Sequence, residues 1–329
     1  MTTDPAEQLQ HLYETELRPV FEELEAERQA LLQRLLISGL IALAATGLLV
    51  LLVLRWGFEI SFFVIVAGIT IWWIVNGGRV QRYRANFKNH VVGRLVRFFN
   101  ATMRYEPNSG ISQAEFSASE IFRQRIDRYS HEDLITGTIG ATAFRFSEVH
   151  AEYKTESTDS KGRRRTTWHT IFKGIFYIAD FNKHFNGRTI VQPDVAQSLL
   201  GGLGQMLQGV GRKLSFSGDE LVKLEDPEFE KLFVVYSTDQ IEARYILSTS
   251  LMQRLTQFRK TMGVDVSLSF VNSKINLAIA TRKNLFEPPH LWQSTRLQLS
   301  DLQEYLQDIK LAEDVVNELN LNLRIWTKA

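Results

Sequence analysis

The side chains that most often perform catalysis or bind metals are scattered through this sequence and form no recognised constellation. Seven histidines are present and cysteine is absent, which excludes thiolate zinc sites, cysteine nucleophiles and disulfides. The nearest approaches to a ligand cluster are His131-Glu132-Asp133 and the pair His150 and Glu152. Sequence neighbours in a helix point apart, so the first group would make a poor chelate. The sequence therefore predicts no metal ion and no other cofactor.

A second group of polar residues crowds the end of the apolar segment Thr166–Phe181: Asp180, Asn182, Lys183 and Arg188. These residues would form the site if the protein were an enzyme. Asn182, however, is typical of a turn. The GxSxG and SxxK motifs of hydrolases and the protein-kinase signatures are missing. We therefore assign no catalytic residue and favour a protein that is not an enzyme.

Two clusters of basic residues could bind an anionic surface. Anionic lipid head groups attract such residues by about 1 kcal/mol each. Basic residues beside an apolar segment also set its orientation, and a basic hairpin tip can simply be solvated, so both simpler explanations stay open. The candidate lipid contacts are Arg79, Arg82, Arg84 and Lys88 in one cluster, and Lys161, Arg163, Arg164 and Arg165 at the tip of a predicted β-hairpin.

Two long apolar segments near the N-terminus would position these clusters at a membrane. Leu35–Leu54 holds 20 residues without a charge, and a helix of that length, about 30 Å, matches the hydrocarbon core of a bilayer. Residues 56–77 form the second apolar segment, with Glu59 as its one ionisable residue. A buried helical hairpin of a soluble protein rarely needs two such segments in succession. We predict two transmembrane helices, 35–54 and 56–77, with an interfacial belt of Trp56, Trp72 and Trp73.

The distribution of basic residues predicts the orientation. Residues 79–104 carry seven lysines and arginines and no acidic residue, whereas the loop between the two spans carries only Arg55. The positive-inside rule places the basic segment in the cytoplasm. We therefore expect a multi-pass protein of the cell (inner) membrane, with both termini cytoplasmic and the lipid bilayer as its first partner.

The remaining segments change their periodicity along the chain. Residues 1–34 are expected to form an amphipathic helix, which Pro19 should break or kink. Residues 79–105 should form a basic juxtamembrane helix, and residues 106–329 a cytoplasmic domain. In that domain the expected strands are Leu134–Tyr153, Thr166–Phe181, Arg188–Gln192, Leu221–Glu225, Phe229–Ser237, Val264–Phe270 and Lys274–Thr281.

Three helices are expected in the same domain. One begins at Ser112, which forms a capping box with Glu115, one covers residues 239–262, and one begins at Ser300. This order of elements predicts an α+β domain, with a mainly antiparallel sheet and flanking helices, attached to a two-helix transmembrane hairpin.

Charge balance and glycine spacing argue against two further classes: nucleic-acid-binding proteins and proteins with a phosphate-binding loop. The chain has 38 basic and 37 acidic residues, and this balance argues against a nucleic-acid partner. Residues 197–211 are rich in glycine but lack the GxxxxGK[ST] spacing of a phosphate-binding loop. We interpret this interval as a flexible or weakly helical excursion.

Three strings resemble a bacterial family known as domain-of-unknown-function family 3137: Gly137–Val149, Phe172–Asp194 and Lys223–Ser248. The resemblance extends over nearly the whole chain. It implies an N-terminal helix, a membrane hairpin and then this α+β domain. Because the family has no assigned function, the resemblance supports class and location and implies no chemistry.

These observations favour a membrane-tethered cytoplasmic module that binds a protein partner or the anionic membrane surface. The alternative is an enzyme that acts at the membrane surface through an unrecognised site. The N-terminal helix and the helix of residues 300–319 each have an apolar side. The two sides either bury each other within one chain or contact another protein or a second copy, giving a homo-oligomer.

Overall fold

The computed structural model describes residues 5–54, 57–158, 162–181, 183–194 and 219–319. The chain divides into two units. We call residues 1–95 and 286–305 the helical unit, and residues 96–285 and 306–329 the sheet unit. The glycine-rich interval 197–211 lies outside the described residues.

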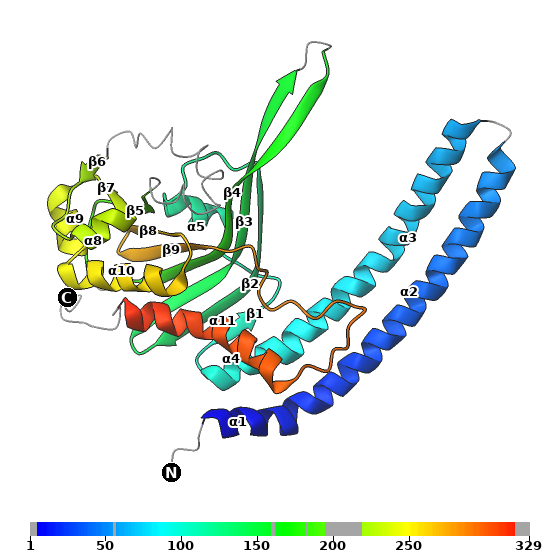
Figure 1. Ribbon diagram of the computed structural model, residues 1–329, viewed down its shortest axis with the longest axis horizontal. Helices are drawn as coiled ribbons and strands as arrows, with labels where there is room; N and C mark the ends of the chain where they lie inside the picture. The colour runs from blue at the N-terminus through cyan, green and yellow to red at the C-terminus, as the bar shows by residue number, and fades with distance from the viewer. Residues whose placement is uncertain (1–4, 55–56, 159–161, 182, 195–218, 320–329) are drawn as a thin grey trace. The chain divides into compact units, whose positions relative to one another are not determined.

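The helical unit is built around two long antiparallel helices (Figure 1). Its elements are α1 (Pro5–Leu12), the π-helical turn η1 (Tyr13–Leu17), α2 (Arg18–Val53), α3 (Phe58–Phe87), the π-helical turn η3 (Lys88–Val92) and the start of α4 (Gly93–Phe99). Helix α2 passes residue 34 without interruption, and α3 likewise continues past residue 77. Pro19 does not break the helical path, because it lies in the first turn of α2, where a missing N–H is tolerated.

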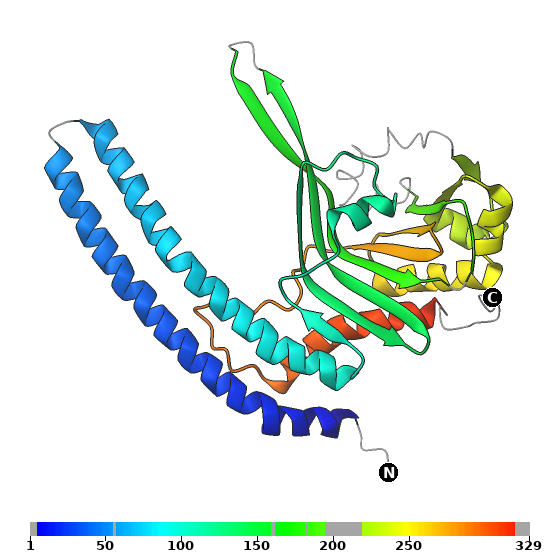
Figure 2. The same ribbon diagram turned by 180° about the vertical axis from the view of Figure 1, so that it is seen from behind.

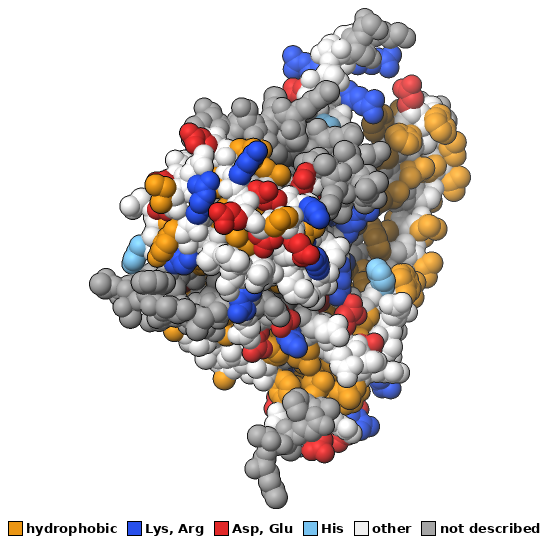
Figure 3. Space-filling model, turned by 60° about the vertical axis from the view of Figure 1, so that its left-hand side comes forward, with side chains coloured by type: hydrophobic (Ala, Val, Ile, Leu, Met, Phe, Trp, Pro, Cys, Tyr) orange, Lys and Arg blue, Asp and Glu red, His pale blue; other side chains and the backbone are white. Residues whose placement is uncertain are grey.

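The apolar halves of α2 and α3 are exposed. Among the described residues, two helices are long and apolar enough to cross a membrane. None of the most apolar stretch of the first, and only 6% of that of the second, is buried. Exposed side chains here include Leu43 (74% exposed) and Phe63 (69%), and Figure 3 shows hydrophobic side chains gathered along these helices. The core helix of a soluble protein would bury these residues, so the exposure argues against that alternative.

The other halves of these helices are buried within the chain. The apolar side predicted for the N-terminal helix is shielded from solvent, for example at Leu17, Phe21 and Leu24. The apolar side of the C-terminal helix α11 (Leu299–Glu318) is buried as well, at Leu302, Ile309 and Val316, and so is Leu319, which directly follows the helix. The described residues of both apolar sides are therefore buried.

The sheet unit contains a nine-stranded sheet with the order β1-β2-β3-β4-β9-β8-β5-β7-β6. All of its strand pairs are antiparallel. The prediction of an α+β domain with a mainly antiparallel sheet is therefore confirmed. The strands are β1 (Arg104–Glu106), β2 (Arg128–Ile139), β3 (Thr142–Thr158), β4 (Arg164–Asp180), β5 (Thr189–Pro193), β6 (Glu220–Val222), β7 (Phe233–Ser237), β8 (Val266–Val271) and β9 (Lys274–Ala280).

Helices cover both faces of this sheet (Figure 2). Helix α5 (Gln113–Ala118) lies on one face, and α10 (Thr249–Met262) lies on the other. Under α5 the core contains Phe116, Phe172 and Phe176. Alternate residues on the opposite face of β3 and β4 form a second aromatic stack, Phe144, Phe146 and Tyr177.

The prediction of a strand over Phe229–Ser237 is wrong for the first half of this range. Residues Pro227–Leu232 form helix α8, and only Phe233–Ser237 form a strand, β7. The Asp226 side chain caps α8 by accepting hydrogen bonds from the backbone N–H groups of Glu228 and Phe229. Asp-Pro before an apolar residue is a local helix-start signal, which the strand-like composition obscured.

Two predicted helices also have different limits. The helix expected over 239–262 is two helices, α9 (Gln240–Ile246) and α10, separated at Leu247 and Ser248. The basic helix expected over 79–105 ends at Phe99, because Asn100 accepts a hydrogen bond from the Thr102 N–H and turns the chain. Arg104, placed in that helix by its charge, begins β1 instead.

Candidate functional sites

A buried ion pair lies on α2 in the helical unit. Glu25 and Arg28 are only 5% and 9% exposed. The guanidinium of Arg28 donates to both carboxylate oxygens of Glu25, at 2.6 Å from Nη2 and 3.0 Å from Nε. This hydrogen bonding holds the pKa of the Glu25 carboxyl well below its usual range. Both groups are therefore charged in the folded protein.

This pair also binds a segment from the far end of the chain. The backbone N–H of Thr295 donates to Glu25 at 2.8 Å, and Arg28 donates to the carbonyl of Leu291 at 2.6 Å. The hydroxyls of Tyr83 on α3 and Thr295 lie 2.8 Å apart. We call residues 286–298, which connect β9 to α11, the strap. Polar contacts thus join the strap to both long helices.

The sequence prediction did not include Glu25 or Arg28 among the functional residues. A signal was available, since opposite charges three residues apart follow Leu24 on the apolar side of the helix. Charges on an apolar side are expected to be paired. The partner on the strap, 270 residues away in sequence for Thr295, leaves no such signal.

The basic residues of α3 and of the start of η3 divide into two groups. The Lys88 side chain is 6% exposed and lies 3.0 Å from Glu287 of the strap, so this residue is not available to lipid. Arg84 is 59% exposed, with Glu287 3.9 Å away. Arg79 donates to the Asn76 side chain at 2.9 Å, and Arg82 is exposed. Arg79, Arg82 and Arg84 therefore remain as candidate lipid contacts.

The predicted tryptophan belt is also divided. The Trp72 indole N–H donates to Ser38 Oγ of α2 at 3.1 Å, so Trp72 joins the two helices. Trp73, the next residue, is 69% exposed and keeps the environment expected of a belt residue. Trp56 lies outside the described residues. Of the two described tryptophans of the belt, Trp73 has the exposure that an interfacial position requires.

Small residues allow α2 and α3 to approach each other. A Cβ placed on Gly68 of α3 would lie 2.3 Å from Thr46 Oγ1 and 3.2 Å from Thr46 Cβ of α2. Close packing through glycine and threonine is typical of transmembrane helix pairs. A groove of about 630 Å³ runs beside this contact and is lined by apolar residues of both helices, including Ala42, Val50 and Ile69.

In the sheet unit, β3 and β4 extend beyond the sheet as a two-stranded arm (Figure 1). The arm consists of residues 154–158 and 164–168, paired from Lys154↔Trp168 to Thr158↔Arg164. All of these residues are exposed. At about 3.3 Å per residue the described arm is roughly 15 Å long. Two-stranded hairpins are marginally stable alone, so the arm depends on support at its base.

Contacts from β2 brace the base of the arm. The Arg128 guanidinium lies 3.8 Å from the centre of the Trp168 ring and pairs with Glu152 at 3.1 Å. The Tyr153 and His169 rings stack with centroids 4.8 Å apart. These contacts hold the two strands in a defined direction where they leave the sheet.

The tip of the arm is basic. Arg163, Arg164 and Arg165 are exposed, and Lys161 lies outside the described residues. Arg164 and Arg165 make no ion pair with any residue that the structure describes. Of the hairpin's candidate lipid contacts, these two therefore present free positive charge to the solvent.

The polar residues at the end of β4 do not converge. Asp180 lies opposite Lys274 in the ladder, and Asn182 lies outside the described residues. The Lys183 ammonium contacts the carbonyl of Tyr245 and lies 4.5 Å from the centre of its ring. Burial lowers the pKa of Lys183. Arg188 points elsewhere. The described members of this group therefore share no common point at which a substrate could bind.

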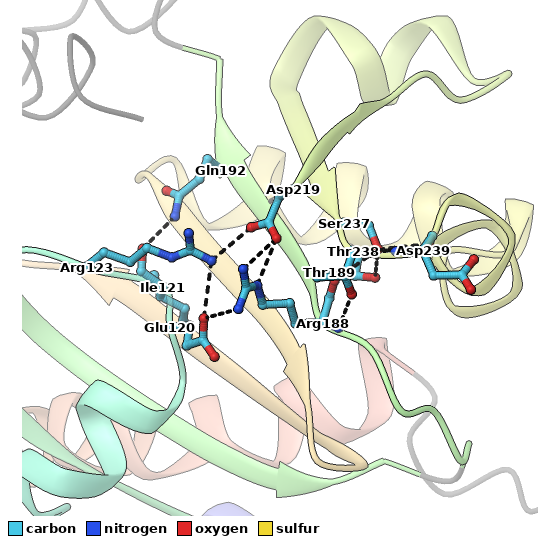
Figure 4. A network of polar contacts seen from close by, with 10 residues as sticks. All are labelled: Glu120, Ile121, Arg123, Arg188, Thr189, Gln192, Asp219, Ser237, Thr238 and Asp239. Atoms are coloured by element: carbon cyan, nitrogen blue, oxygen red, sulfur yellow. Dashed lines mark hydrogen bonds and ion pairs between the residues drawn. The ribbon is translucent and has the colours of Figure 1, made fainter. Parts of the chain in front are cut away.

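Arg188 instead belongs to a closed network of charges (Figure 4). Its guanidinium contacts Asp219 at 2.7 Å and Glu120 at 2.9 Å, and Arg123 contacts the same two carboxylates at 2.8 and 3.2 Å. The Asp219 side chain has no exposure, and its hydrogen bond raises the pKa of Arg188. Two cations balance two anions, so the network holds the chain at Asp219 and leaves no charge for a ligand.

The histidine groups singled out in the sequence have structural contacts. Asp133 is buried, has a positive φ of 60°, and accepts a hydrogen bond from the Tyr105 hydroxyl at 2.5 Å. It lies at an irregularity in the pairing of β2 with β3, where the register shifts between Glu132 and Ile135. His150 Nε2 lies 3.7 Å from Glu152 Oε1, and Glu152 is the residue that pairs with Arg128.

Comparison with known proteins identifies the class of the domain. Residues 170–321 match the model of the family described as "protein of unknown function (DUF3137)". The match contains two of the three strings that suggested this family, Phe172–Asp194 and Lys223–Ser248, and so confirms the resemblance there. The third string, Gly137–Val149, lies outside the matched residues, as do α2 and α3.

One solved structure aligns with a large part of the chain. It is the crystal structure of the mycobacterial trehalose monomycolate transport factor A, TtfA, with a TM-score of 0.33 and 10% sequence identity. The alignment covers 69% of this chain and 95% of TtfA. A likeness of this degree carries no functional argument. No curated protein sequence matches the chain.

Proposed function

We propose that this protein is a membrane-anchored module whose β-arm contacts the anionic surface of the membrane that holds it. The helices α2 and α3 would cross the cell (inner) membrane twice, with both termini in the cytoplasm. The sheet unit would then lie on the side where anionic lipid head groups attract arginine. The observation that carries this proposal is the projecting arm, whose free arginines Arg164 and Arg165 lie at its end.

The charge of the arm supports an anionic target. Its described residues, including the tip, carry four basic side chains and one acidic side chain: Lys154, Arg163, Arg164, Arg165 and Glu156. Threonine and serine occupy most of the other positions, so the arm offers little apolar surface to a protein partner. Attraction to head groups needs exposed positive charge, which the arm carries.

The proposal predicts a lipid-dependent change at the arm. Because the chain has no cysteine, Ser157→Cys can carry a single environment-sensitive fluorophore on the full-length protein. In nanodiscs that contain anionic phosphatidylglycerol, we expect a blue-shifted emission that weakens as salt is added. In nanodiscs of neutral phosphatidylcholine, the emission should match that of the solvated arm.

Charge-reversal variants test whether the shift in emission depends on the charge of the arm or on charge elsewhere on the surface. Changing Arg163, Arg164 and Arg165 to glutamate should abolish the shift, whereas Lys231→Glu on exposed α8 should leave it unchanged. An equal shift in neutral nanodiscs, or an undiminished shift in the reversed variant, would contradict the proposal. Enzymatic turnover that is lost in Asp180→Asn would instead favour the alternative, an enzyme at the membrane surface.

A further inference from the structure

Strands β8 and β9 have one face of large side chains and one face of small side chains. Successive residues of a strand point to opposite faces, and the ladder pairs Ser267 with Ala278 and Ser269 with Asn276. Small residues of the two strands therefore adjoin. The large face consists of Val266, Leu268, Phe270, Ile275, Leu277 and Ile279, all of them buried.

The small face forms the floor of a pocket in the sheet unit. Its volume is about 270 Å³, and its floor includes Ser267, Ala278 and Ala280. Phe122 and Phe172, whose ring centroids lie 5.3 Å apart, form a wall. Large aromatic residues beside small ones thus create a hollow that the sheet itself does not fill.

The interior of the pocket offers apolar surface. The one polar side chain of the floor, Ser267, donates to Gln192 Oε1 at 2.9 Å, and Gln192 in turn donates to the carbonyl of Ile121 at 3.0 Å. These hydrogen bonds use the Ser267 hydroxyl and one of the two N–H groups of the Gln192 amide. An occupant of the interior is therefore bound through apolar contact.

The rim of the pocket carries unbalanced positive charge. Asp265 is neutralised by Arg259, at 3.0 Å. Arg282 also lines the pocket and makes no ion pair with a described residue, whereas Lys173 follows Phe172 in β4 and its side chain lies on the opposite face. A free cation beside an apolar hollow matches a ligand that joins a hydrocarbon chain to an anionic head.

We propose that this pocket binds a single-chain anionic amphiphile, such as a fatty acid. Its hydrocarbon chain lies against Phe122, Phe172 and the small face, and its carboxylate lies at Arg282. The volume of about 270 Å³ is just below the usual range of about 300–1,000 Å³ for ligand pockets, so the pocket accommodates at most one chain. This site lies apart from the β-arm, and it stands whether or not the arm contacts lipid.

The test uses the full-length protein in phosphatidylcholine nanodiscs and a fatty acid with a photoreactive diazirine on its chain. After irradiation and digestion, we expect labelled peptides that contain residues 171–173 or 278–282, in addition to background labelling of the apolar helices. Excess unlabelled dodecanoate should suppress the labelling of these peptides. The methyl ester of the probe, which lacks the charge, should label them less.

Variants test the two parts of the site separately. Ala280→Leu should fill the hollow and remove the labelling. Arg282→Ala, at an exposed position that does not affect folding, should weaken it by about two- to fivefold. Lys231→Ala, outside the pocket, should have no effect. The proposal is overturned by labelling confined to α2 and α3, by equal labelling with the ester, or by displacement with a hydrophobic peptide but not with dodecanoate.

Discussion

Glu25 and Arg28 lie one helical turn apart, in a position shielded from water. Removing one member of a buried ion pair leaves the other charge uncompensated, which costs about 3–5 kcal/mol. Glu25→Gln would also weaken the acceptor of the Thr295 N–H. We therefore expect this variant to lower the free energy of unfolding of the helical unit by about that amount. Tryptic cleavage after Arg296 of the strap should become faster.

An exposed glutamate on the same helix provides the control. Glu23 lies two residues before Glu25 and is exposed, so Glu23→Gln should leave both the thermal midpoint and the cleavage rate unchanged. Equal protection of the strap in Glu25→Gln and in the native protein would show that the ion pair does not hold it.

The depressed pKa of Glu25 gives the same contact a dependence on pH. A carboxyl group whose pKa is lower in the folded state stabilises that state above its unfolded pKa, which is about 4.3 for glutamate. This stabilisation is lost as the pH falls from that value toward the lower folded pKa. Acid unfolding of the helical unit should therefore depend less on pH in Glu25→Gln, as followed by circular dichroism.

At the scale of elements, the packing of α2 against α3 depends on a missing side chain. Gly68→Ala places a Cβ against Thr46, so the helices must separate, and overpacking of this kind costs about 1–3 kcal/mol. Gly77 in the same helix has no heavy atom within 4 Å of the position of a Cβ. There alanine should be neutral or stabilising, because it favours the helix over glycine by up to about 1 kcal/mol.

Both substitutions replace glycine with alanine, but their expected effects on the stability of the helix pair have opposite signs. The thermal midpoint of the full-length protein in nanodiscs, followed by far-ultraviolet circular dichroism, should fall in Gly68→Ala and should hold or rise in Gly77→Ala. A fall of equal size in both would show that helix propensity, and not the contact with Thr46, determines the response.

At the scale of the whole molecule, the exposed apolar helices and the basic residues within 79–104 predict the topology. The absence of cysteine allows single cysteines to report accessibility. Ser300→Cys, at an exposed position near the start of α11, should resist an impermeant maleimide in intact spheroplasts and react after lysis. Phe58→Cys, beside the turn between the long helices, should react in intact spheroplasts. Labelling of Ser300→Cys before lysis would reverse the proposed orientation.

Features that depend on neighbouring residues could be predicted from the sequence. Ser112 and Glu115 form the expected capping box, and Gly263 ends α10 with a φ of 63°. Asn272 and Ser273 form the turn between β8 and β9, both with positive φ. The lengths of the apolar segments likewise follow from composition. Capping, turn geometry and hydrophobic periodicity act over a few residues, so the sequence determines them by itself.

The features on which function rests were decided by tertiary structure. Lys88 became an interior ion-pair residue because Glu287, distant in sequence, packs beside it, and Arg188 became part of a closed network because Arg123 and Asp219 meet there. The pocket exists because β8 and β9 place their small residues on the same face, next to Phe122 and Phe172. Burial and charge pairing depend on which distant segments come together. The packing of the whole core brings those segments together, and it therefore determines which charged residues are paired and which are exposed.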